Sequence, residues 1–413
     1  MMDYLVDSNS AAGGGRGDDT PAIQSAIDSC AAAGGGRVVL LEGRRYSASS
    51  IVLKSNVELH LQDGAELIAN TGFQRFIKPS ELEYDPPRPN AAHKPPIVWL
   101  YAFGQSNISI TGRGTLVGNA DSVTGPVNRY ISTHIGLPRP TLIYLEGCRN
   151  VTISDVSIRK APFWTLHPAG CEDVVISRVR IQNDLNCANS DGIDPDHCRN
   201  VLIEDCDIQC ADDCIVLKNT LGNTEYGSCE NITVRGCRLV STSAAVKIGT
   251  ESFGDFNTIT VSGCSIDRSN RGLSIQLRDG GSVDHVLFEN ISVDTRRFSE
   301  DWWGCGEPIS VTVLPRTEQT VCGTVSGIVF KGIRCDSENG ILLYSHEDGH
   351  IDGIRFEDVE LNLHRKTKWF DNTYDLRPCA MAGLIQRETE PLFLFHAGNV
   401  DCSNILIHNS LIG

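Results

Sequence analysis

Two short clusters of carboxylates are the part of this sequence best suited to chemistry. The first is NSDGID (residues 189–194), and the second, ADDC (residues 211–214), follows about one repeat later. Neither cluster contains a Lys or Arg that would neutralise it. Repulsion between like charges raises at least one carboxyl pKa and so separates an acid from a base. An acid and a base held close together are what the hydrolysis of a glycosidic bond requires.

The elements that position these carboxylates are predicted by a repeated strand pattern. Apolar and polar residues alternate over a short strand, a tight turn follows, and a second strand begins. Copies start at residues 55, 106, 149, 172, 199, 230, 257, 284, 327, 353 and 403. Units of this length cannot bury an apolar face alone and must stack. The pattern predicts an all-β protein, a single right-handed parallel β-helix of about ten to eleven coils, rather than a β-propeller with its longer blades.

We expect one domain over residues 1–413, with residues 1–50 forming an N-terminal cap and first coil. A short helix over residues 18–32, with Pro21 in its first turn, is predicted to cap that coil. The repeat is interrupted at residues 76–97, 119–140, 296–321 and 364–395, which predicts long loops, the last of them an inserted loop at 364–395.

Composition limits the possible partners. The chain has 413 residues, 39 of them Gly and only three Met, which favours strands and turns over helices. A net charge of −16 argues against nucleic acid and anionic membranes as partners, and no apolar run is long enough to span a membrane. The first residues lack the features of a signal peptide. We therefore expect a cytoplasmic protein, or a secreted one whose leader was removed; the oligomeric state is not indicated.

The cysteines recur at equivalent points of the repeat. Such a pattern predicts free, buried thiols stacked in ladders, in preference to disulfides or a metal site. The chain contains 16 Cys, and the spacing of Cys206, Cys210 and Cys214 does not match a structural zinc site. We expect no metal and no cofactor.

The whole chain resembles the pectin-degrading glycoside hydrolases of family 28, the polygalacturonases and rhamnogalacturonan hydrolases. DDTPAIQSAID and GGGRVVLLEG resemble the family's N-terminal cap and first coil, and SITGRGTLVGN resembles its second coil. NSDGID is similar to the family's Asn-Thr-Asp-Gly-x-Asp motif, and ADDC to its Gln-Asp-Asp-Cys motif. The resemblance implies a parallel β-helix that hydrolyses pectic carbohydrates of the cell wall with inversion.

The resemblance also implies roles for the carboxylates. Asp212 would be the general acid, while Asp191 and Asp213 would hold and deprotonate the attacking water, with carboxyl groups roughly 6.5–9.5 Å apart. Spacing supports this independently, because 22 residues, close to one coil, separate Asp191 from Asp213. Strict alternation would place Asp212 and Asp213 on opposite faces, so the pair is predicted to lie at a bend. For Asp194 a structural role and a substrate-binding role both stay open.

The chain departs from the family pattern on the next two coils. The family's Gly-His-Gly aligns with a stretch in which Ala244 takes the His position, and its cationic Arg-Ile-Lys aligns with SIQ (residues 274–276). Gln276 and Arg278 are expected to face the substrate, with Lys247 roughly beside Gln276. A neutral clamp and a negative chain favour an exo-acting or oligosaccharide-directed enzyme of altered specificity over one cutting polygalacturonate.

Other residues are candidates for substrate binding. Trp302 and Trp303 are adjacent aromatics in a long loop, suited to stacking on sugars. Lys218 follows the Asp pair by one strand, and Asn189 opens the first motif. An oligosaccharide or polysaccharide substrate is the only partner indicated.

Three other classes stay open. A β-helical polysaccharide lyase would need a calcium-binding carboxylate cluster and a basic residue. A glycosyl transferase could use the same carboxylates, since exclusion of water separates the two outcomes. A non-catalytic carbohydrate-binding β-helix would not need its acid and base.

Overall fold

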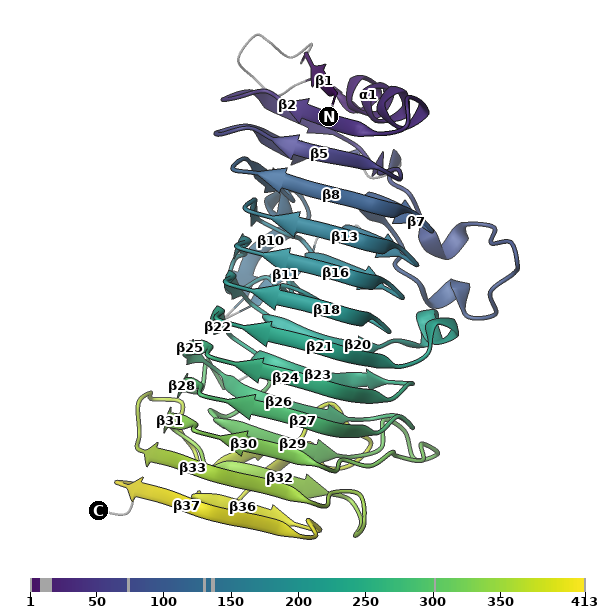
Figure 1. Ribbon diagram of the computed structural model, residues 1–413. Helices are drawn as coiled ribbons and strands as arrows, with labels where there is room; N and C mark the ends of the chain where they lie inside the picture. Colours follow the sequence, from purple (N-terminus) through teal and green to yellow (C-terminus); the bar gives the residue numbers. More distant parts are fainter. Residues whose placement is uncertain are drawn as a thin grey trace.

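The chain winds into a right-handed parallel β-helix in which successive coils add strands to three parallel ladders (Figure 1). The computed structural model describes residues 2–7, 17–72, 75–128, 131–134, 138–300 and 302–411. Parts of three predicted segments lie outside these residues: 8–16 of the N-terminal cap, 129–130 and 135–137 of the loop at 119–140, and residue 301 of the loop at 296–321.

The first ladder contains the strands predicted from the repeats. Each of the eleven copies forms a strand of it, and two earlier strands, β1 and β2, extend the stack at its N-terminal end. Its members in stacking order are β1 (Asp3–Val6), β2 (Gly36–Leu40), β5 (Val57–Leu61), β8 (Ser106–Gly112), β13 (Arg149–Ser154), β16 (Glu172–Ser177), β18 (Arg199–Glu204), β21 (Cys229–Arg235), β24 (Phe256–Ser262), β27 (Val283–Glu289), β30 (Ile328–Lys331), β33 (Ile354–Leu363) and β37 (Val400–Asn409).

The second ladder is formed by the short strands that follow the turn of each repeat. They are β3 (Arg45–Ala48), β6 (Glu66–Ala69), β9 (Thr115–Val117), β14 (Ser157–Arg159), β17 (Arg180–Gln182), β19 (Asp207–Cys210), β22 (Arg238–Ser241), β25 (Ser265–Ser269), β28 (Ser292–Thr295) and β31 (Arg334–Ser337). The far halves of β33 and β37 continue it.

The third ladder carries the residues of greatest functional interest. Its strands are β4 (Ile51–Val52), β7 (Val98–Phe103), β12 (Thr141–Glu146), β15 (Leu166–Ala169), β20 (Ile215–Asn219), β23 (Ala244–Ser252), β26 (Arg271–Leu277), β29 (Ile309–Val313), β32 (Ile341–Ser345) and β36 (Leu392–Phe395). Between β15 and β20, single bridges through Ile193 and Asp196 keep the ladder continuous. The NSDGID motif is therefore one rung of this ladder.

Apolar residues repeat at the same place in each coil and fill the interior. The buried rings of Phe288, Phe330 and Phe356 stack 5.0 and 5.1 Å apart on successive coils. All 16 cysteines lie in the described residues and are free thiols, as predicted, and only Cys402 is exposed. Because a buried thiol is small and apolar, one on each coil lets the coils stack closely.

The N-terminal end of the helix is closed by α1 (Thr20–Ala32) and β1. The helix begins two residues later than predicted, has Pro21 in its first turn, and buries Ile23, Ile27 and Cys30. The short strand β1, which the repeat pattern does not single out, pairs with β2 and so covers its edge. No helix within the described ranges has both the length and the apolar character needed to cross a membrane.

Three predicted loops carry small elements of their own. The loop at 76–97 contains the 3₁₀ turns η2 (Pro79–Glu81) and η3 (Ala91–His93), and it projects beside β7 toward η5 (Leu221–Tyr226) in Figure 1. The loop predicted at 364–395 contains the antiparallel pair β34 (Thr373–Asp375) and β35 (Leu384–Gln386), but it is shorter than predicted because its last four residues form β36. The loop predicted at 296–321 is likewise interrupted by β29 of the third ladder. The loop at 119–140 contains η4 (Ala120–Ser122) and the antiparallel pair β10 (Thr124–Asn128) and β11 (Ile131–His134).

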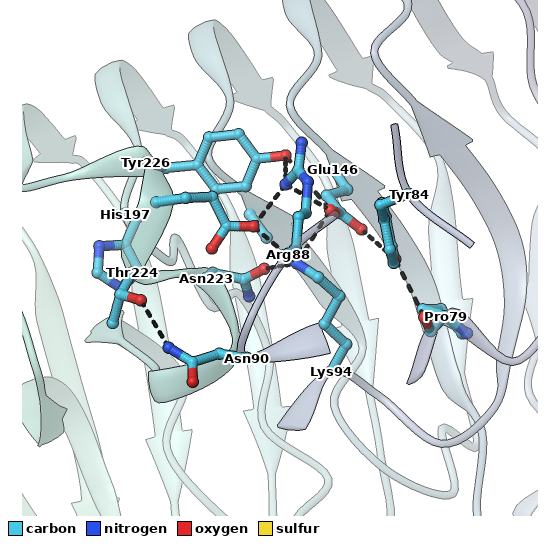
Figure 2. A network of polar contacts seen from close by, with 12 residues as sticks. Pro79, Tyr84, Arg88, Asn90, Lys94, Glu146, His197, Asn223, Thr224 and Tyr226 are labelled. Atoms are coloured by element: carbon cyan, nitrogen blue, oxygen red, sulfur yellow. Dashed lines mark hydrogen bonds and ion pairs between the residues drawn. The ribbon is translucent and has the colours of Figure 1, made fainter. Parts of the chain in front are cut away.

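A buried ionic network fastens the loop at 76–97 to the third ladder (Figure 2). Glu146, at the end of β12, is fully buried, with Arg88 Nη1 and Lys94 Nζ each 3.0 Å from its Oε1. Tyr84 donates a hydrogen bond to the other carboxyl oxygen at 3.2 Å. Lys94 also donates to Asn223 Oδ1 of η5 at 2.7 Å. Losing one partner of a buried ion pair leaves an uncompensated charge and strongly destabilises the folded protein. The network therefore holds the loop against the ladder.

Thiol accessibility tests the cysteine assignment. With Ellman's reagent we expect the native protein to show one fast-reacting thiol, Cys402, because nearly all the others are buried. After denaturation without reductant all 16 should react. Reductant should also leave the melting temperature unchanged, and fewer than 16 thiols in the denatured protein would reveal a disulfide and contradict the assignment.

Candidate active site

The stacking register brings the two carboxylate motifs together on adjacent rungs. The Gly192 N–H donates to the Asp213 carbonyl at 2.9 Å, and Ile193 pairs with Ile215. Residues 211–214 form a bend immediately before β20, as predicted, so Asp212 and Asp213 are released from strict strand alternation. One carboxyl oxygen from each of Asp191, Asp212 and Asp213 lies within 4.8 Å of the others.

This separation is smaller than expected. An inverting glycosidase usually holds its two carboxyl groups roughly 6.5–9.5 Å apart, with a water between them. Here the nearest oxygens are within 4.8 Å because two of the three Asp are neighbours in the chain and the third lies one rung away. The distance therefore does not by itself predict the stereochemical outcome.

Asp213 is held as an anion by its surroundings. Lys247 Nζ donates to its Oδ2 at 2.6 Å, and the Ser243 hydroxyl donates to its Oδ1 at 2.9 Å. The Ala244 N–H adds a third hydrogen bond at 3.1 Å. Burial alone would raise the pKa of Asp213, but the charges of Lys247 and Lys218 outweigh it and hold this pKa below its usual value. Asp213 is thus suited to act as a base.

Asp212 has the opposite character. Burial, reinforced by the negative charge of Asp213, raises the pKa of Asp212 to about 6, although Lys247 and Lys218 oppose the shift. The N–H of Asn189 donates to its Oδ2 at 3.0 Å and that of Asp213 to its Oδ1 at 3.1 Å, which fixes the orientation of the carboxyl group. It is also more exposed than Asp191 or Asp213. A carboxyl with these properties can donate a proton to a substrate.

Asp191 and Asp194 share the buried cation of Lys218. The lysine Nζ lies 3.5 Å from Asp191 Oδ2 and 3.7 Å from Asp194 Oδ1. Burial and neighbouring carboxylates nevertheless raise both aspartate pKa values well above normal. Asp191 is therefore better suited to hold a water through a protonated carboxyl than to deprotonate it. Asp194 is fully buried, but Asp191 and Asp213 are only 2% and 1% exposed, so burial does not distinguish a structural from a substrate-binding role for Asp194.

The structure adds three side chains that the motifs do not single out. Glu251 Oε2 lies 3.6 Å from Lys218 Nζ, and strand alternation from Lys247 could have indicated that they share a face. Lys218 Nζ also lies 4.3 Å from the centre of the Trp164 ring. Arg139 donates to Asn189 Oδ1 at 2.8 Å and to the Ala188 carbonyl, so it positions the first motif from a distant loop without any local sequence signal.

Three predicted substrate-binding residues are placed differently from the expectation. Gln276 is 2% exposed and donates to Ser274, so it does not face an open surface. Arg278 is fully buried; its guanidinium donates to backbone carbonyls, among them those of Leu376 and Pro378 in the inserted loop. Alternation correctly placed both outside the core, but the inserted loop covers Arg278. Trp302 is 6% exposed and packs on Phe298, whereas Trp303 is 47% exposed.

The family-28 model, described as glycosyl hydrolases family 28, matches residues 89–379. This range covers both carboxylate motifs and most of the coils, and the chain belongs to that family. A probable polygalacturonase from Vitis vinifera is 28% identical over 253 residues, 58% of this chain and 50% of the relative. A polygalacturonase from Chamaecyparis obtusa is 22% identical over 380 residues, 87% of this chain and 67% of the relative.

Solved structures share the fold. An exopolygalacturonase from Thermotoga maritima superposes with a TM-score of 0.69 and 20% identity, covering 98% of this chain and 91% of that one. A polygalacturonase from Erwinia carotovora gives 0.68 and 18% identity, covering 89% and 95%. The alignments span about half or less of the length of the first curated relatives.

Lys247 is predicted to set the pH range of activity. Its charge lowers the pKa of both Asp213 and Asp212, so replacing it should raise both. With Asp212 expected as the acid and Asp213 as the base, activity would require Asp213 ionised and Asp212 protonated. In wild type kcat/KM should then be lost above pH about 6 and, at low pH, only below the usual aspartate pKa. In Lys247→Met both limbs of the pH profile should move to higher pH.

The control is Lys331→Met, which removes an exposed lysine paired with Glu289 at 3.1 Å on β30. Its profile should match that of wild type. If Lys247→Met lowered activity equally at every pH, the lysine would not govern the protonation of the aspartates.

Proposed function

We propose that the protein is an inverting glycoside hydrolase that acts on pectic or related oligosaccharides from the chain end. The observation that carries this proposal is the division between two adjacent carboxyls: Asp212, with a pKa of about 6, and Asp213, held as an anion by Lys247. Family membership supports the same chemistry.

The reaction follows from this division. Asp212 donates its proton to the leaving oxygen as the glycosidic bond breaks, and Asp213 takes a proton from the water that attacks the anomeric carbon. Asp191, whose pKa is raised well above normal by burial and by Asp212, orients that water. Lys218 and Lys247 stabilise the cluster while its charges change. Inversion is the family's outcome, and the short carboxyl separation makes its direct measurement necessary.

Exo action is supported by the cover on both sides of the carboxylates. Toward the N-terminus, the outward side chains of the third ladder, Tyr101, Tyr144 and His167, are buried beside the network that anchors the loop at 76–97. Toward the C-terminus, Ser274, Gln276, Ser310 and Thr312 are buried on the same face. Arg271 and Arg278 donate to the carbonyls of Asp375 and Leu376, which holds the inserted loop there.

A long polysaccharide crossing several coils would need this face to be open. Among the residues that the structure describes, exposure on this face is found at a short stretch around Asp212, Lys247 and Glu251 and returns beyond the covered coils at Tyr344 and Phe395. A chain end fits such a stretch better than the middle of a polymer. One of the curated relatives, 25% identical over 215 residues, is an exopolygalacturonase from Cochliobolus carbonum.

A neutral sugar beside the cleaved bond is supported by the charges. Lys218 is shared by three carboxylates and Lys247 is paired with Asp213. Arg316 is paired with Asp279, and Arg271 lies near Glu307. Each of these cations is already paired with a carboxylate of the protein. None is therefore available to bind a uronate carboxylate, either through two hydrogen bonds from an Arg or through the charge of a Lys. The specificity thus departs from that for polygalacturonate.

A lyase mechanism is disfavoured because Lys218 is held in its protonated form. Burial alone would lower the pKa of Lys218, but Glu251, Asp191 and Asp194 outweigh it and raise this pKa well above normal. A lysine held as a cation cannot abstract a proton from a uronate. Two of the three clustered Asp also have an ammonium counter-ion each, Lys218 for Asp191 and Lys247 for Asp213.

The thiols support a reducing compartment as the place of action. Ladders of free cysteines persist where glutathione and thioredoxin keep thiols reduced, whereas oxidising compartments favour disulfides. An enzyme located there would meet imported oligosaccharides rather than intact cell walls.

Removing the acid tests the assignment of Asp212. Asp212→Asn should lower kcat by about 10²–10⁴-fold on substrates with a poor leaving group, because proton donation is lost. A substrate with a good leaving group should lose far less, since it needs no acid. Asp173→Asn, which changes an exposed carboxylate on β16, serves as the control. Equal losses on both substrates would assign Asp212 another role.

Product analysis tests stereochemistry and exo action together. Pectic oligosaccharides with neutral and uronic ends are incubated with the enzyme, and proton NMR follows the first anomer released. We expect an inverted anomer and a single small product from the chain end. A retained anomer would overturn inversion, and random mid-chain cleavage of homogalacturonan would overturn exo action and the proposed specificity.

A further inference from the structure

A second group of potential ligands lies away from the carboxylates, at the turn that follows β32. His346 comes directly after the strand, Glu347 is next, and His350 ends the turn, which Gly349 allows with φ of +85°. One ligand atom of each of the three side chains lies within 4.8 Å of the others. The two imidazole rings are 4.7 Å apart between centres and tilted by 31°.

Backbone carbonyls fix the chemical form of both histidines. His346 Nδ1 lies 3.2 Å from the Val313 carbonyl, and His350 Nδ1 lies 2.8 Å from the Gly323 carbonyl. A carbonyl oxygen can only accept, so each Nδ1 carries the proton and each Nε2 keeps its lone pair. Metal-binding histidines are commonly oriented in this way, with the second ring nitrogen bound to a carbonyl.

The charges on the turn leave one carboxylate uncommitted. Asp348 pairs with His396 at 2.7 Å, whereas Glu347 forms no ion pair with any residue that the structure describes. The exposed Glu347 carboxylate is therefore free to complete a site with the two imidazoles. Three ligands on one turn, two of them held by the preceding coil, form a preorganised arrangement.

We propose that His346, Glu347 and His350 bind a divalent transition-metal ion of the zinc class. Two imidazole nitrogens and one carboxylate oxygen suit Zn²⁺, whereas Mg²⁺ and Ca²⁺ prefer oxygen ligands alone. Three protein ligands leave one position of a tetrahedral ion for water.

The ion would join the turn at 346–350 to the segment 313–323, because the carbonyls that accept hydrogen bonds from the two histidines, those of Val313 and Gly323, belong to that segment. The site lies on the same ladder as Lys247 but three strands farther along, through β26 and β29 to β32. At about 4.8 Å per coil, the site lies roughly 14 Å from Lys247 along the stack. The ion would therefore link the C-terminal coils and take no part in hydrolysis.

Zinc titration of the chelator-treated protein tests the proposal. Isothermal titration calorimetry should show one saturable site, with zinc raising the melting temperature. His346→Gln/His350→Gln should weaken this affinity by at least about a hundredfold, and Glu347→Gln by about tenfold, in the range seen when metal-site residues are altered. Replacement of Zn²⁺ by Co²⁺ should give the visible absorption of a four-coordinate ion.

Two variants separate this site from others. His396→Gln removes the neighbouring histidine, and Asp212→Asn alters the other cluster able to hold an ion; both should retain the zinc affinity of wild type. The metal-free double Gln variant should melt at the temperature of metal-free wild type, which excludes misfolding. The proposal is overturned if zinc binding is unaffected by the double change, or if it is lost in Asp212→Asn.

Discussion

The ion pair between Lys247 and Asp213, 2.6 Å long, is the interaction on which the site depends. Asp191, Asp194, Asp212, Asp213 and Glu251 gather where water is largely excluded, and such a cluster is strongly unfavourable unless cations compensate it. Lys247 and Lys218 supply that compensation, one at each side. Because the compensation is uneven, Asp213 stays ionised while Asp212 is raised to a pKa of about 6. One face thus holds both an acid and a base.

The β-helix makes this arrangement possible by stacking. Rungs that are distant in sequence are held at a fixed spacing, so Lys247 on β23 reaches Asp213, which begins the rung before it. The loops then decide how much of the face a substrate can use. The ionic network around Glu146 anchors one loop and the Arg271 and Arg278 contacts anchor another. The coils thus position the charged residues, while the two loops cover the third ladder on either side of them.

Sequence predicted what depends on local pattern. The repeats predicted the strands, and the motif spacing placed Asp191 one rung from Asp213. The altered substrate clamp at residues 274–276 stays a prediction. The burial of Arg278 could not be predicted, because the loop that covers it lies about 100 residues away in the chain. The contact between Ser243 and Asp213 could not be predicted either, because it depends on the register between coils. The family pattern aligns its His with Ala244, the residue next to Ser243.

The most direct test is to titrate the aspartate side chains themselves. In protein labelled with ¹³C at the aspartate carboxyls, NMR should show one resonance that titrates near pH 6 and is absent from Asp212→Asn. A second resonance, absent from Asp213→Asn, should stay ionised to below the usual aspartate pKa. If the resonance lost in Asp212→Asn titrated below pH 4 instead, Asp212 would not be the acid and the division between the two carboxyls would be contradicted.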